Sequence, residues 1–211
     1  MSDPPFPDFP PEAFAKQDTD DDLAFYAPPR LVTHIDEGAV AALTQAYRQL
    51  LPAGGRLLDL MSSWVSHLPD DREYAEVVGH GMNAVELEAN PRLTRWFVQN
   101  LNQNPLLPLG DQAFDAAMAC VGVQYLQQPV AVFAEVRRVL VPGAPFIVSF
   151  SNRCFPTKAV AIWRALDTSG QAALVKLYLE RTGFTDISAN LLADGAASDP
   201  LVAVIGLTPK P

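Results

Sequence analysis

The sequence predicts one α/β domain built on a mainly parallel sheet that a C-terminal antiparallel hairpin closes. Short apolar runs alternate with segments of helical periodicity from residue 36 to residue 150, an order typical of parallel strands joined by right-handed crossovers. Two further β-rich runs, 184–192 and 201–207, have no helical segment between them, so they should pair antiparallel. The chain has 211 residues, of which 49% are apolar. This is enough to form the core of a single domain of this kind.

Helical segments are indicated by apolar residues three and four positions apart and by the residues that stop them. The first begins at Asp36 and carries an apolar stripe to Leu51, where Pro52 and two glycines end it. The other predicted helices are 84–90, 130–140, 157–166 and 171–182.

The predicted strands are seven short runs of mostly apolar residues. Residues 145–150 are apolar almost throughout, which is typical of a strand covered on both faces. The strands are 56–61, 76–80, 96–99, 114–120, 145–150, 184–192 and 201–207.

Residues 1–22 differ from the rest of the chain in composition. Five prolines come first and four aspartates follow: Pro4, Pro5, Pro7, Pro10, Pro11, Asp18, Asp20, Asp21 and Asp22. Such a segment buries too little apolar surface to offset its ordering entropy. We expect it to form a flexible or draped arm, with residues 23–211 as the single domain.

The net charge of −9 argues against binding to nucleic acid or to an anionic membrane surface. The first residues lack the basic start and apolar run of a secretory signal, so a cytoplasmic protein is expected. Cys120 and Cys154 are the only cysteines, and reduced thiols are expected in that compartment.

Four segments resemble a known family: RLLDL at 56–60, LPLGDQAFD at 107–115, VFAEVRRVLVPG at 132–143 and GFT at 183–185. They are similar to motifs of the class I S-adenosylmethionine (SAM)-dependent methyltransferases, type 11-like, in a divergent branch with an altered glycine turn. The similarity runs from about residue 41 to residue 207. It implies a Rossmann-like, seven-stranded fold with helices on both faces, SAM as cofactor and a small-molecule methyl acceptor.

In open α/β sheets the ligand lies beyond the carboxyl ends of the strands. On this rim the resemblance implies that the cofactor would contact Asp59, Met61, Ser62, Ser63, Gly81, Met82, Asn100, Leu101, Asn102 and Cys120. Asp59 would receive the amino group of the cofactor, or alternatively bond the backbone N–H groups of its own turn.

Several of these positions depart from the family pattern, which implies weak or altered SAM binding. Met61 and Ser63 stand where the family has glycines, and Gly81 stands where it has the carboxylate for the ribose. Glu86 and Glu88 lie further along a helix and are judged poor substitutes for that carboxylate. Ser62, Ser63 and Ser66 could instead cap a following helix and present its N–H groups to a carboxylate.

The acceptor is expected near side chains of the N-terminal region and of the loops that follow the fourth and fifth strands. The predicted acceptor-binding residues are Tyr26, Arg30, Gln124, Asn152 and Arg153, with His34 a further candidate in the N-terminal region. No residue is identified as catalytic.

Other chemistries are weaker alternatives. His67 and His80 could join Cys120 in a metal site, but no close ligand spacing supports one, and no metal is expected. Cys120 and Cys154 could form a redox pair, although buried inert cysteines are commoner. Ser62 and Ser63 suggest a nucleophile elbow without its glycines. A catalytically inactive protein of this fold, binding another ligand or a partner protein, is the alternative to a methyltransferase.

Overall fold

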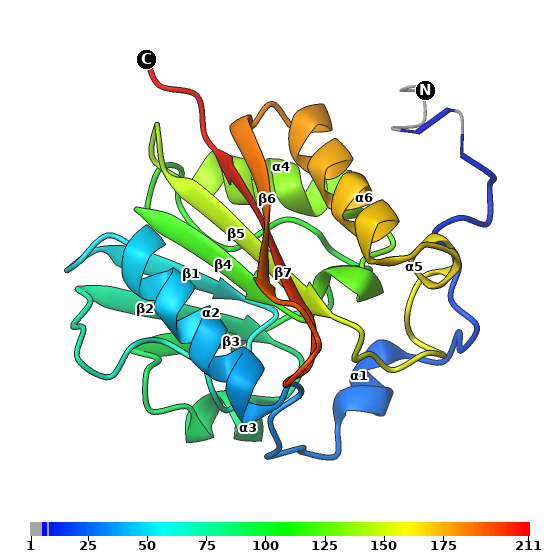
Figure 1. The fold of residues 1–211 in the computed structure, drawn as a ribbon, viewed down its shortest axis with the longest axis horizontal. Helices are drawn as coiled ribbons and strands as arrows, with labels where there is room; N and C mark the ends of the chain where they lie inside the picture. The colour runs from blue at the N-terminus through cyan, green and yellow to red at the C-terminus, as the bar shows by residue number, and fades with distance from the viewer. Residues whose placement is uncertain (1–5, 8) are drawn as a thin grey trace.

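The computed structural model describes residues 6, 7 and 9–211 and contains one seven-stranded sheet in the order β3-β2-β1-β4-β5-β7-β6 (Figure 1). The first five strands are parallel, and β7 is antiparallel to both β5 and β6. The mainly parallel sheet with a C-terminal antiparallel hairpin is therefore confirmed. The strands are β1 (Arg56–Leu60), β2 (Glu76–Gly81), β3 (Arg95–Val98), β4 (Ala116–Cys120), β5 (Pro145–Ser151), β6 (Thr185–Ala193) and β7 (Leu201–Leu207).

Helices cover both faces of the sheet, as predicted, because successive strand residues point to opposite sides. In β1, Leu57 packs with the core under α2 (Glu37–Leu50), whereas Leu58 packs with the core under α4 (Pro129–Val139) and α6 (Thr168–Arg181). The same alternation runs through β4, β5 and β7. The inner strands of the sheet are thus buried between helices, whereas the edge strands β3 and β6 are largely exposed. The rim of the sheet is left for ligands.

The remaining helical elements are short. They are α1 (Asp22–Tyr26), α3 (Ala84–Ala89), α5 (Ala161–Ala165) and the 3₁₀ turn η1 (Val123–Tyr125). The predicted helix 157–166 is reduced to α5, and α1 was not predicted at all. Its few residues carry no apolar periodicity that a sequence pattern could show.

No helix joins β1 to β2, so the prediction that Ser62, Ser63 and Ser66 cap one is wrong. The polar groups of residues 61–75 bond to the neighbouring elements instead. Ser62 N–H donates to His80 O at 2.6 Å, and Ser63 O accepts from Asn90 Nδ2 at 2.9 Å. These bonds hold the start of the connection against β2 and the end of α3.

The N-terminal arm is draped over α5 and α6 where it is described. The ring of Phe6 stacks on the rings of Phe9 and Phe14, with centroid separations of 4.9 and 5.4 Å. Its centroid lies 5.7 Å from that of Tyr178 in α6. Ala161 N–H donates to Ala15 O at 2.9 Å. Pro4 and Pro5 of the predicted flexible arm lie outside the described residues, and the flexibility of the arm stays a prediction.

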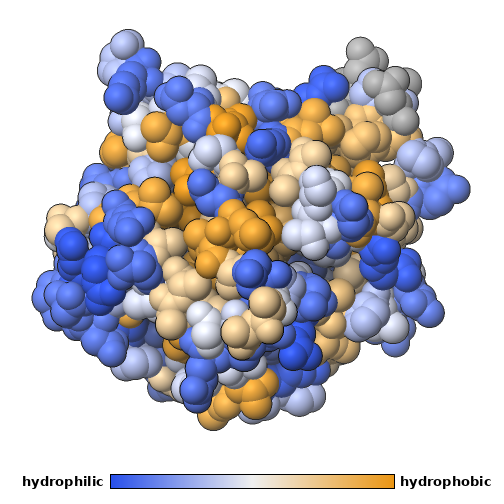
Figure 2. Space-filling model, in the orientation of Figure 1, coloured by the Kyte–Doolittle hydropathy of each residue, from blue (hydrophilic) through white to orange (hydrophobic). Residues whose placement is uncertain are grey.

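Among the described residues no helix is long and apolar enough to cross a bilayer. The face shown in Figure 2 mixes hydrophilic and apolar residues, with apolar residues gathered near its centre.

Candidate functional site

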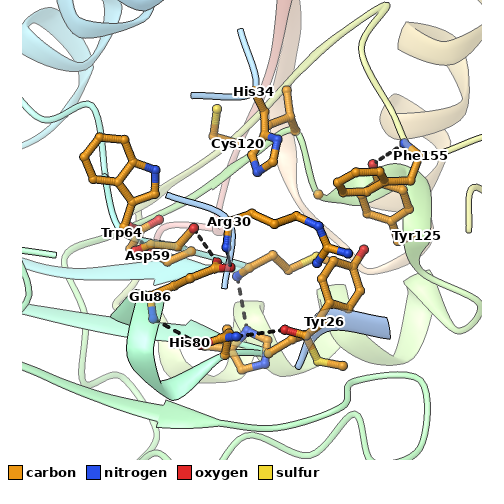
Figure 3. Close-up of a pocket in the computed structure, with 18 of the residues that line it drawn as sticks. Tyr26, Arg30, His34, Asp59, Trp64, His80, Glu86, Cys120, Tyr125 and Phe155 are labelled. Carbon is orange, nitrogen blue, oxygen red and sulfur yellow. Dashed lines mark hydrogen bonds between the residues drawn. The ribbon is translucent and has the colours of Figure 1, made fainter. Parts of the chain in front are cut away.

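A cavity of about 230 Å³ lies beyond the carboxyl ends of β1, β2 and β4, between that rim and the N-terminal segment (Figure 3). Its floor includes the residues that directly follow these strands, and its roof includes Tyr26, Arg30 and His34. This is the position at which open α/β sheets bind ligands.

All ten residues predicted to bind a cofactor line this cavity: Asp59, Met61, Ser62, Ser63, Gly81, Met82, Asn100, Leu101, Asn102 and Cys120. Three of the predicted acceptor-binding residues also line it: Tyr26, Arg30 and Arg153. The other two do not. Gln124 is buried with its Nε2 donating to Val121 O at 2.8 Å, and Asn152 is an exposed residue beside Ser151.

The turn after β1 explains why position 81 is glycine. Met61 takes a left-handed conformation with φ of 57°, as a glycine would do easily. The turn then passes so close to β2 that a Cβ on Gly81 would lie 2.6 Å from the Ser62 carbonyl oxygen. A carboxylate side chain at position 81 is therefore excluded by the path of the turn.

Asp59 is buried at the end of β1 and accepts a hydrogen bond from Ser62 Oγ at 2.6 Å. Burial raises the pKa of its carboxyl group to about 6, although serine hydroxyls lower it in part. Among the described residues no backbone N–H and no cationic side chain bonds this carboxylate. The alternative that Asp59 bonds the backbone N–H groups of its own turn is therefore wrong, because its bond to the turn comes from the Ser62 hydroxyl. The carboxylate lines the cavity without a cationic partner in the described residues.

Glu86 lines the cavity, although the sequence predicted it to be a poor substitute for the carboxylate that binds the ribose. Its carboxylate accepts from Ser63 Oγ at 2.6 Å and from the Arg30 backbone N–H at 2.7 Å, and its side chain lines the cavity. Asn83 caps α3 by accepting from Glu86 N–H at 3.2 Å, which places Glu86 in the first turn of the helix. The spacing of Asn83 and Glu86, an N-cap with an acid three residues later, is the sequence signal that could have identified it.

The two amides after β3 differ in what they can offer a ligand. Asn102 is fully engaged, since its Nδ2 donates to Asp22 and to Tyr125 O and its Oδ1 accepts from Gln127 N–H. Asn100 uses only its Oδ1, which accepts from Asn102 N–H at 3.0 Å. Its Nδ2 has no protein partner in the described part of the chain and lies in a residue that lines the cavity.

The metal site and the nucleophile elbow, which were weaker alternatives from the sequence, do not assemble among the described residues. No group of three or more metal-ligating side chains occurs in residues 6, 7 and 9–211. Both cysteines are free thiols, and burial raises the pKa of Cys120 to about 12. Ser62 and Ser63 donate to Asp59 and Glu86 rather than to a histidine.

His80 joins the ends of three strands. Its Nδ1 accepts from Met61 N–H at 3.1 Å, so its Nε2 carries the proton and donates to Gln99 O at 2.9 Å. The ring is buried, and burial lowers its pKa to about 4. His80 is therefore a neutral structural residue under the turn.

We expect the buried His80 ring to make stability depend on pH. The unfolded chain binds a proton at His80 near pH 6.5, whereas the folded chain does not until about pH 4, so stability should fall as the pH is lowered through this window. The loss at about pH 4.5 should be on the order of 2 kcal/mol relative to neutral pH.

Urea unfolding of the wild type and of His80→Gln at both pH values measures this contribution. All other titrating groups remain in the variant, so their effects cancel in the difference between the two proteins. An equal loss of stability in both proteins on acidification would contradict the assignment.

The roof of the cavity is tied to the rim by specific bonds. Asn83 Nδ2 donates to Tyr26 O and Ala27 O at 2.8 and 2.9 Å, and Trp64 Nε1 donates to Val32 O at 3.0 Å. Behind the roof, Asp22 pairs with Lys16 at 2.5 Å and with the fully buried Lys158 at 3.3 Å. The arm is therefore tied to the rim on this side of the cavity.

The comparisons with known proteins agree with this architecture. Residues 64–148 match the methyltransferase domain family. No curated protein sequence matches the chain.

Solved structures of SAM-dependent methyltransferases share the fold. One is from Aquifex aeolicus, with a TM-score of 0.60, 14% identity and coverage of 81% of this chain and 90% of that chain. Another, from Mesorhizobium loti, has a TM-score of 0.55 and 18% identity over 79% of this chain and 97% of that chain. A chain from the complex of the Haloferax volcanii Trm112 methyltransferase activator with a methyltransferase has a TM-score of 0.64 and 13% identity, covering 83% and 91%.

Proposed function

We propose that this chain, which has the class I SAM-dependent methyltransferase fold and matches the methyltransferase domain family, binds SAM in the rim cavity and transfers its methyl group to a small molecule. The observation that carries the proposal is the row of three ligand-facing polar groups in one cavity. Asp59 lies at the end of β1, Glu86 lies beside the end of β2, and Asn100 follows β3.

These three groups suit the three polar parts of the cofactor. The buried carboxylate of Asp59 has no cationic partner in the described residues and would receive the amino group. Glu86 would accept the ribose hydroxyls in place of the carboxylate that Gly81 cannot supply. The uncommitted Nδ2 of Asn100 would donate to a ring nitrogen of the adenine.

Met61 and Ser63, which stand where the family has glycines, leave space in the cavity. The hydroxyl of Ser63 is turned to Glu86, and the side chain of Met61 lies against Gly122, where a Cβ would be 2.8 Å from Met61 Cβ. The cavity of about 230 Å³ is smaller than most ligand pockets, which begin near ~300 Å³. We therefore propose that the roof around Arg30 shifts when the cofactor enters.

When bound, SAM supplies a methyl group on a sulfonium, and the protein has to place the acceptor and exclude water. The N-terminal roof supplies the exclusion. His34 lines the cavity and contacts Phe155 at a ring separation of 5.8 Å, and burial lowers the pKa of its ring. It is therefore neutral at neutral pH and can take a proton from the acceptor.

Calorimetric titration with SAM and S-adenosylhomocysteine tests the proposal. We expect dissociation constants in the range of tens of micromolar, or roughly −6 to −7 kcal/mol, because the glycine turn and the ribose carboxylate are altered. ATP, which shares the adenosine but lacks the amino acid, is the control and should bind more weakly. No heat and no thermal shift at millimolar ligand would favour the alternative, an inactive protein of this fold that binds another ligand.

A further inference from the structure

Arg30 presents a cation to the cavity without a carboxylate partner. Its guanidinium donates to the carbonyl oxygens of Phe25 and Pro28 at 3.0 and 3.4 Å, and within the described residues no carboxylate lies within ion-pair distance of it. The other lysine and arginine that line the cavity are paired, Lys16 with Asp22 and Arg153 with Asp199. A half-buried guanidinium with donors to spare favours an anionic ligand.

The guanidinium is held in a fixed orientation by an aromatic cluster, which consists of Phe25, Tyr26, Tyr125 and Phe155. Its central carbon lies 4.7 Å from the ring centre of Phe25, 5.3 Å from Phe155 and 5.9 Å from Tyr26. Tyr125 Oη accepts from Phe155 N–H at 2.9 Å, which fixes the cluster to the loop after β5. An arginine stacked in this way loses little side-chain entropy when it binds a carboxylate or phosphate.

The cavity therefore has two walls of opposite charge. Asp59 and Glu86 form the acidic wall beside β1 and β2. Figure 3 shows the head of Arg30 pointing away from both carboxylates, toward Tyr26 and Tyr125. The acidic wall suits the cationic amino and sulfonium groups of SAM, so the wall that carries Arg30 remains for the second substrate.

We propose that the methyl acceptor is an anionic small molecule, with a carboxylate or phosphate that Arg30 binds against the aromatic cluster. This inference rests on the proposed function, since it assigns the acidic wall to SAM. It names the chemistry of the acceptor, which the fold alone leaves open.

The test uses benzoate and phenyl phosphate as probes and benzyl alcohol as the uncharged probe of similar size. Each is titrated into the wild type, Arg30→Gln, Arg30→Lys and the control Arg181→Gln, with and without saturating S-adenosylhomocysteine. Arg181 is exposed near the end of α6 and makes no ion pair among the described residues.

We expect both anions to bind the wild type and Arg181→Gln about tenfold or more tightly than Arg30→Gln, with Arg30→Lys between them. Benzyl alcohol should not distinguish the proteins. Equal anion affinity in the wild type and in Arg30→Gln would overturn the proposal.

A second titration distinguishes whether Arg30 binds the carboxylate of the cofactor or that of the acceptor. S-adenosylhomocysteine carries one, and 5′-methylthioadenosine does not. If Arg30→Gln weakens only S-adenosylhomocysteine by about tenfold, the guanidinium binds the cofactor and the acceptor proposal is overturned. If Arg30→Gln leaves both nucleosides unchanged and loses the anions, the proposal is supported. Failure of SAM binding itself would appear separately, in the titrations without anions.

Discussion

Replacing Asp59 by asparagine is expected to weaken S-adenosylhomocysteine binding by about a hundredfold while making the protein more stable. The loss of affinity follows because a charge-assisted hydrogen bond to the ligand amino group is worth roughly 1.5–3 kcal/mol. The gain in stability follows because the buried carboxylate has no cationic partner among the described residues. Its pKa of about 6 lies above the value of 3.8 that it has in solvent.

The direction in which the difference in unfolding free energy changes with pH identifies Asp59 as its source. The pKa of Asp59 is raised in the folded chain, so its ionisation lowers the stability of the native state progressively between about pH 4 and about pH 6. The full penalty is present above about pH 6, and there is almost none below about pH 4. Asp59→Asn should therefore exceed the wild type in unfolding free energy by on the order of 2 kcal/mol at about pH 8, and by little at about pH 4. Urea unfolding at both pH values measures this difference.

Asp111→Asn is the matched control, because that side chain is exposed and paired with Arg138. It should leave ligand affinity unchanged. Undiminished ligand binding by Asp59→Asn would show that the amino group of the cofactor is bound elsewhere.

Replacing Lys158 by methionine should lower the unfolding free energy by about 3 kcal/mol, the scale of losing one partner from a buried ion pair. Lys158 is completely buried, donates to Asp20 O at 2.8 Å and lies 3.2 and 3.3 Å from carboxylate oxygens of Asp18 and Asp22. Methionine preserves most of the volume but leaves both carboxylates with less compensation. Because these partners belong to the arm, proteolysis within residues 17–30 should accelerate as well.

Lys210→Met is the control for this substitution, since Lys210 is exposed near the C-terminus. Its effect should stay within about 0.5 kcal/mol. A loss below about 1 kcal/mol in Lys158→Met would mean that the aromatic contacts and backbone hydrogen bonds hold the arm without this buried ion pair.

The architecture was predictable because it depends on local patterns. Each buried strand is a short apolar run, and the loop between residues 193 and 200 has no room for a crossover helix. The carboxyl ends of parallel strands meet at one rim, so the residues that end or directly follow the strands, together with the family resemblance, were enough to place Asp59, Met61 and Cys120 in one cavity.

The missed features depend on contacts between distant segments. The turn after β1 bonds to β2 through Ser62 and His80, and these contacts with another strand do not show in the local sequence. Glu86 enters the cavity because Ser63 and the backbone of Arg30 reach it from other parts of the chain. Asn102 is engaged by Asp22, which lies 80 residues earlier in the sequence.

The bonds that hold the N-terminal segment over the cavity have a consequence for the rate at which ligands enter and leave. Bonds from Asn83 and Glu86 fasten the segment around Tyr26 and Arg30 to the floor, so this segment moves away from the floor only when several of them break together. In many enzymes, the opening of a segment that covers the active site is slower than the chemical step. Under the proposed methyl transfer, the turnover number would then report how often residues 22–34 lift away, and an initial burst of product would precede the steady state.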